Sequence, residues 1–178
     1  GETAGRGPIL RSGARPGDIV AVCGRLGWAA AGLAALLRGF RSPRAAVDSQ
    51  RAPKVPYGAG RQAADAGATA MIDVSDGLLA DLGHIAEASG VAIDLDSARF
   101  TIAEPVQAVA AALNADPLGF VLGGGEDHAM AATFEPGKVP EGWDVIGQVR
   151  QINDEVGPIV LVDGQEWEGE KGWTHFHP

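Results

Sequence analysis

The stretch Ala70-Met-Ile-Asp-Val-Ser-Asp-Gly-Leu-Leu-Ala-Asp-Leu82 changes its pattern half-way along. The apolar run that leads up to Asp73 is typical of a buried strand. The next segment, 77–89, predicts an amphipathic helix, because its apolar residues recur at i, i+4 and i+7 as Leu78, Leu82 and Ile85. A strand that leads directly into a helix indicates a sheet with helices packed on it.

The same kinds of pattern recur along the rest of the chain. Runs of β-branched or alternating residues predict further strands at 18–24, 91–96, 127–134, 143–149 and 158–162. Helical spacing predicts helices at 28–38 and 104–113. Helices and strands alternate at first and strands cluster later, so the sequence predicts an α/β (α+β) fold, a mixed sheet with helices packed on it.

Two segments of this pattern carry specific expectations. The helix predicted at 28–38 has Leu33, Leu36 and Leu37 on one stripe, as a core-facing helix would, and Gly39 stands where a C-cap glycine is favoured. The segment 40–60 contains three prolines among arginines. It is predicted to be a long surface connection, which would be functional, a lid or a partner contact.

Composition bounds the class of protein. With 178 residues, 46% of them apolar and 21% charged, the chain is predicted to form one globular domain. Its longest apolar run, 28–37, is far shorter than the about 20 residues that a bilayer requires, so no membrane span is expected. Cys23, the single cysteine, cannot form an intramolecular disulfide, and no basic-then-apolar leader precedes the fold. A reducing cytoplasm is therefore the expected compartment.

Charge is distributed unevenly along the chain. The formal net charge of −9 argues against nucleic-acid binding through the overall field. Residues 1–61 hold ten basic and three acidic groups, whereas residues 62–178 hold four basic and twenty acidic groups. Such a split could provide a basic surface and a cation-binding surface in one molecule, as a site for a metal and a nucleotide would require. The alternative is that both are solvated surface.

The junction Asp73-Val-Ser75-Asp76-Gly77 carries the sharpest chemical signal. It places two carboxylates and a hydroxyl where a buried strand meets a helix. Mg²⁺ prefers oxygen ligands of this kind, and the N–H groups at the start of a helix suit an anion such as phosphate. The alternative is structural: Ser75 or Asp76 caps the helix, and Asp73 is an exposed strand end.

A second signal is Gly123-Gly-Gly-Glu126-Asp127-His128, which precedes a predicted strand. Three glycines allow backbone conformations closed to other residues and let a ligand approach closely. Glu126 and Asp127 would then stand at the start of the strand. The alternative is a flexible turn with solvated acids. No second His or Cys lies at metal-binding spacing from His128, so His128 is interpreted as structural or exposed.

Two further residues are candidates on weaker grounds. Trp173, in the aromatic segment 171–176 near the end of the sequence, is either a core plug or a stacking platform for a flat ring. Arg11 precedes a glycine turn and is a planar cationic donor that could contact phosphate or adenine. An exposed arginine without a ligand is the alternative for Arg11.

Taken in order, these stretches resemble the thiamine-monophosphate kinase family, whose members use ATP to convert thiamine monophosphate into thiamine diphosphate. The resemblance covers essentially the whole chain and is most specific at Asp73–Leu82. The family belongs to the fold superfamily of aminoimidazole ribonucleotide synthetase, whose chains have two α/β domains and usually dimerise through the first. The resemblance thus implies that residues 1–17 connect from an N-terminal domain, that residues 18–178 form the C-terminal α/β domain, and that the two-domain protein is a homodimer.

The resemblance also implies a role for each candidate residue. Asp73 and Asp76 would bind Mg²⁺, Arg11 and Ser75 would contact ATP, and Glu126 and Trp173 would bind thiamine monophosphate. His128 stands where the family commonly has a tyrosine. Family members carry an N-terminal domain with further acidic metal ligands, which these 178 residues do not contain, so we expect the residues alone to be inactive. Two alternatives remain: a non-catalytic nucleotide or thiamine-phosphate binding module, or another ATP-dependent member of the superfamily.

Overall fold

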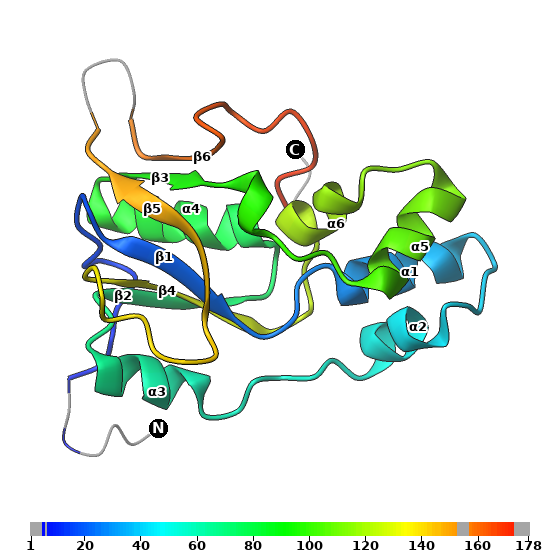
Figure 1. Cartoon of the computed structure of the whole chain (residues 1–178), viewed down its shortest axis with the longest axis horizontal. Helices are drawn as coiled ribbons and strands as arrows, with labels where there is room; N and C mark the ends of the chain where they lie inside the picture. The colour runs from blue at the N-terminus through cyan, green and yellow to red at the C-terminus, as the bar shows by residue number, and fades with distance from the viewer. Residues whose placement is uncertain (1–4, 6, 153–156, 173–178) are drawn as a thin grey trace, which may run out of the picture.

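The computed structural model describes residues 5, 7–152 and 157–172. These residues form a six-stranded sheet of order β2-β4-β1-β5-β3-β6 (Figure 1). Neighbouring strands are antiparallel except for β3 and β6, which are parallel. This confirms the predicted mixed sheet. The strands are β1 (Ile19–Cys23), β2 (Ala70–Val74), β3 (Ala92–Leu95), β4 (Ala129–Phe134), β5 (Asp144–Arg150) and β6 (Ile159–Val162).

Helices cover both faces of the sheet and extend it at one end. Helix α4 (Leu78–Ser89) packs on one face and α3 (Ala59–Ala66) on the other. The remaining helices gather beyond the end of the sheet where β2 leads into α4 (Figure 1). They are α1 (Trp28–Leu37), α2 (Arg44–Arg51), α5 (Glu104–Leu113) and α6 (Pro117–Gly123), and a short 3₁₀ turn, Ser97–Arg99, follows β3.

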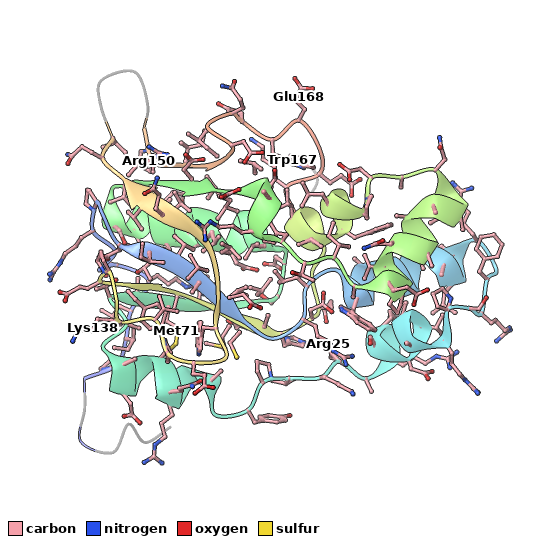
Figure 2. All side chains as sticks on the ribbon, viewed as in Figure 1. Arg25, Met71, Lys138, Arg150, Trp167 and Glu168 are labelled. Atoms are coloured by element: carbon pink, nitrogen blue, oxygen red, sulfur yellow. The ribbon has the colours of Figure 1, made fainter. Side chains whose placement is uncertain are left out.

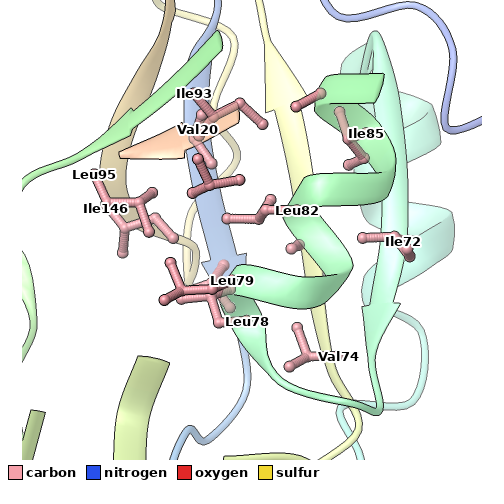
Figure 3. Packing of buried hydrophobic residues seen from close by; sticks show 14 of the residues in the cluster. Val20, Ile72, Val74, Leu78, Leu79, Leu82, Ile85, Ile93, Leu95 and Ile146 are labelled. Carbon is pink, nitrogen blue, oxygen red and sulfur yellow. The ribbon is translucent and has the colours of Figure 1, made fainter. Parts of the chain in front are cut away.

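The main core lies between α4 and the sheet (Figure 3). Leu78, Leu82 and Ile85 of α4 are fully buried, which confirms the helix pattern that the sequence predicted. Strand side chains alternate between faces. In β1, Val20 therefore joins this core, whereas Ala21 packs with α3 on the opposite face.

The segment 40–60 contains more regular structure than predicted. It holds all of α2, and α3 begins at Ala59. Pro43 and Pro53 flank α2 rather than interrupt it, and Ala46 and Val47 bury its inner side against α1. The prediction of a long surface connection missed helix α2, because that helix is stabilised by tertiary packing, which cannot be inferred from the local proline content.

The inner face of α1 also differs from the prediction. Leu33 and Leu37 are 42% and 78% exposed, and the buried residues are small ones: Ala29, Ala31, Gly32 and Ala35. A Cβ on Gly32 would lie 2.2 Å from the carbonyl oxygen of Ala46, so close approach of α2 requires glycine there. The expected role of Gly39 is confirmed: it has φ 77° and its N–H donates to Leu36.

Helix α6 was not predicted by the sequence patterns. It begins after Asp116, whose carboxylate accepts the N–H of Leu118, and Pro117 occupies its first turn. Among the described residues no single helix is long and apolar enough to cross a membrane; one sharply bent pair, α5 with α6, meets the test of length and composition.

Candidate active-site loops

The loop between β2 and α4 is held from inside by Asp81. Its Oδ2 atom accepts the backbone N–H groups of Ser75, Asp76 and Gly77 at 2.9, 3.1 and 3.1 Å. Asp81 is 3% exposed. Burial raises the pKa of its carboxyl group, while the three N–H donors act in the opposite direction. Sequence reasoning did not single out Asp81, because nothing local shows that a residue inside the helix folds back onto the loop before it.

The N-cap position of α4 belongs to Gly77 and not to Ser75 or Asp76, the two residues named in the capping alternative. Gly77 has no side chain to cap the helix, and its own N–H is bound by Asp81. Gly77 has φ 136°, and a Cβ there would lie 2.7 Å from the carbonyl oxygen of Gly123. Asp73 is exposed near the end of β2, and Asp76 is partly exposed in the turn.

The glycine-rich loop at 123–128 lies directly against this turn. The N–H of Glu126 donates to the carbonyl oxygen of Ser75 at 2.8 Å, and the N–H of His128 donates to that of Val74 at 3.1 Å. A Cβ on Gly125 would lie 2.3 Å from the Ser75 carbonyl oxygen. The glycines thus permit close approach of protein backbone, where the sequence pattern suggested close approach of a ligand.

Within this loop, Glu126 and Asp127 have opposite environments. Glu126 is exposed, whereas Asp127 is 2% exposed and caps α1 by accepting the N–H groups of Trp28 and Ala29 at 3.0 and 2.9 Å. Burial raises the pKa of Asp127 to about 6, against the opposing effects of the helix N–H groups and of Arg25. The expectation of two solvated or ligand-facing acids is therefore wrong for Asp127.

Arg11 lies at a different place from Ser75. Arg11 and Asp73 line one groove of about 540 Å³ beside the edge strand β2, together with Met71. The carbonyl oxygen of Arg11 accepts the hydroxyl of Ser89, at the C-terminal end of α4. Arg11 and Ser75 therefore flank opposite ends of α4, although both adjoin β2. Figure 2 shows Met71 below the sheet, toward α3.

The described residues contain no group of three or more His, Cys, Asp or Glu side chains placed to hold a metal ion. Asp73 and Asp76 supply oxygen donors of the type that Mg²⁺ prefers, so they fit that ion when phosphates and water complete its shell. Trp173 lies outside the described residues. Gly172, just before it, packs on the same turn, since a Cβ there would lie 2.9 Å from the Asp76 carbonyl oxygen.

Comparison with known proteins assigns the chain to a family. The family described as AIR synthase related protein, C-terminal domain, matches residues 15–156. The chain belongs to this family. This member of the AIR synthase related family is 51% identical over 178 residues to a thiamine-monophosphate kinase of Mycobacterium tuberculosis. The match covers 99% of this chain and 52% of that protein. A thiamine-monophosphate kinase of Corynebacterium glutamicum is 40% identical over 183 residues, covering 99% of this chain and 54% of that protein.

Solved structures are also similar to this chain. The structure described as AaThiL complexed with AMPPCP and TMP superposes with a TM-score of 0.83 at 32% identity, covering 94% of this chain and 54% of that one. A hydrogenase maturation protein HypE, 18% identical with a TM-score of 0.68 over 87% of this chain and 52% of that one, shares the fold. The chain spans about half the length of the relatives and structures that it matches.

Proposed function

We propose that this chain is the C-terminal half of an ATP-dependent thiamine-monophosphate kinase. The contact between the Ser75 turn and the Glu126 loop is the observation that carries the proposal. It joins a position that the family resemblance assigns to ATP with one that it assigns to thiamine monophosphate. Two substrates between which a phosphoryl group is transferred must lie next to each other, as these two loops do. The relatives named thiamine-monophosphate kinase support the same reaction.

The proposed reaction transfers the γ-phosphoryl group of ATP to a phosphate oxygen of thiamine monophosphate. This nucleophile is already anionic at neutral pH, so no strong general base is required. Asp73 and Asp76 would hold Mg²⁺, which when bound offsets the repulsion between the two phosphate groups. Ser75 and Arg11 would contact ATP, and Glu126 would orient the thiamine part, so that catalysis depends on positioning.

The proposal extends to the arrangement of the whole protein. Residues 1–17 would connect from a preceding domain, and residues 18–178 would form the second domain. The preceding domain would supply the remaining metal ligands and the dimer contact, which agrees with the lack of a three-residue metal group among the described residues. We propose that the enzyme is cytoplasmic. We expect the 178 residues alone not to catalyse the reaction. A module that binds thiamine phosphate without catalysis is the second candidate, favoured by this same incomplete ligand set.

A chimera tests the proposal. This chain replaces the matching portion of the Mycobacterium tuberculosis kinase, and thiamine diphosphate formation from ATP, Mg²⁺ and thiamine monophosphate is measured for the chimera and for the 178 residues alone. We expect turnover by the chimera only, and a loss of orders of magnitude in its Asp73→Asn variant with little change in melting temperature. A folded chimera that binds thiamine monophosphate but forms no product would favour the binding module. Equal rates for chimera and isolated chain would disprove the half-site account.

A further inference from the structure

Two buried carboxylates hold the two loops of the proposed site, and they differ in what they bind. Asp127 caps a helix, α1, that lies outside the loops. Asp81 instead gathers three consecutive N–H groups of the loop that carries Ser75 and Asp76 onto a single oxygen atom. Three successive amides bound to one atom define the backbone path of that turn, and this path sets where the side chains of Ser75 and Asp76 begin.

We propose that Asp81 is a positioning residue that sets the conformation of the 75–77 turn and thereby the placement of Asp76 and Ser75 toward a metal–phosphate ligand. This inference rests on the proposed function for the identity of the ligand. Asp81 itself is buried and hydrogen-bonded to the loop backbone. Its bonded oxygen is occupied by protein N–H groups, so it acts through the turn rather than on the ligand.

The alternative is that the charge of Asp81 acts on the metal directly. Three substitutions separate the two roles. Asp81→Ala removes the acceptor and leaves three N–H groups of the turn without it. Asp81→Asn keeps an oxygen acceptor at the same reach and removes the charge. Asp81→Glu keeps the charge but places the oxygen one methylene further along the side chain, where it no longer matches the turn.

A remote carboxylate provides the matched control. Asp18 is 4% exposed, close to the 3% of Asp81, and its Oδ2 atom accepts the N–H of Arg15 and the hydroxyl of Thr69 at 2.9 and 2.7 Å. Thr69 precedes β2 and Ser75 follows it, so Asp18 lies at the opposite end of that strand. Asp18→Ala therefore removes a buried, hydrogen-bonded carboxylate without touching the turn.

The experiment uses the 178-residue chain with two NMR readouts. The first is hydrogen exchange of the Ser75, Asp76 and Gly77 amides, and the second is the Mn²⁺ concentration that half-broadens the Asp76 signal in the presence of ATP. We expect Asp81→Ala to speed exchange of these three amides and to raise the half-broadening concentration about tenfold, the usual effect of losing a group that orients a metal ligand. Asp81→Asn should stay close to wild type. Asp81→Glu should resemble Asp81→Ala, and it replaces that variant if Asp81→Ala does not fold. Asp18→Ala should lower stability without changing the Mn²⁺ response.

Two results would overturn the positioning role. One is an Asp81→Ala variant in which either the exchange of the three amides or the Mn²⁺ response is unchanged. The other is a Mn²⁺ response lost in Asp81→Asn while the three amides stay protected, which would assign the charge itself to the metal. Protected amides without broadening at any Mn²⁺ concentration, in the wild-type chain and in the chimera that restores the preceding domain alike, would instead count against the proposed function.

Discussion

The backbone N–H of Glu126 donates to the carbonyl oxygen of Ser75 at 2.8 Å, and this bond joins the two loops that carry the proposed site. The pairing continues one step further, from His128 to Val74. Glu126 and His128 both have positive φ angles, 67° and 52°, so the loop reaches this position through a conformation that few non-glycine residues adopt. The placement of Glu126 thus depends on the whole loop rather than on its own side chain.

Gly125→Ala should push these two loops apart. The added Cβ would lie 2.3 Å from the Ser75 carbonyl oxygen, which is backbone and cannot rotate away. We expect a loss of about 1–3 kcal/mol in the free energy of unfolding, as for other overpacked sites, together with reduced turnover by the chimera. Urea denaturation measures the first effect. Gly157→Ala, whose Cβ meets no described atom within 4 Å, is the control and should leave stability nearly unchanged.

A pair of helical glycines should respond to alanine with opposite signs. In α1, Gly32→Ala would bring its Cβ within 2.2 Å of the Ala46 carbonyl oxygen and separate α1 from α2. In α4, Gly83→Ala meets no described atom within 4 Å and should stabilise the protein by about 0.4–1 kcal/mol, because alanine restricts the unfolded chain. Thermal unfolding of both variants checks this. Equal shifts of the same sign would contradict the packing of α2 on α1.

Asp127 should make stability depend on pH in an acidic window. Its pKa is about 6 in the folded protein, against an ordinary value of 3.8. Between these pH values the folded protein holds a proton that the unfolded chain has lost, so the free energy of unfolding falls as pH rises through the window. The full change corresponds to about 3 kcal/mol.

Urea denaturation of wild type and Asp127→Asn at pH 4, 5, 6 and 7 isolates this effect, since asparagine does not titrate. Wild type should lose stability relative to Asp127→Asn as pH rises. A relative gain would mean that the α1 N–H groups, with Arg25, favour the ionised carboxylate more than burial disfavours it.

Trp173→Ala tests the residue that the family resemblance assigns to the thiamine site. Stacking of an aromatic ring contributes about 0.5–1.5 kcal/mol beyond area burial, so in the chimera we expect KM for thiamine monophosphate to rise severalfold while KM for ATP stays the same. Steady-state kinetics with each substrate varied in turn measures this. Equal weakening toward both substrates, with a large drop in melting temperature, would show a core plug instead.

The sequence by itself determined the elements that local patterns encode. The strand and helix on either side of Asp73–Gly77 follow from a change of apolar period. The left-handed glycine that ends α1, Gly39, follows from its place after a helical run. Family-specific order of the motifs also pointed to the AIR synthase related fold, because that information lies in the residues themselves. These features depend on a few neighbours along the chain.

Tertiary structure alone decided the contacts between distant segments. Helix α2 forms because Ala46 packs on Gly32 of α1. The inward-facing residues of α1 are small rather than leucines because this packing brings the two helices close together. Asp127 accepts the first N–H groups of α1, a helix that begins far earlier in the sequence, and Asp81 binds the turn before its own helix. The sequence does not show whether a carboxylate is solvated, binds a metal ion or accepts a backbone N–H. Its partner is fixed only when the sheet brings the segments together.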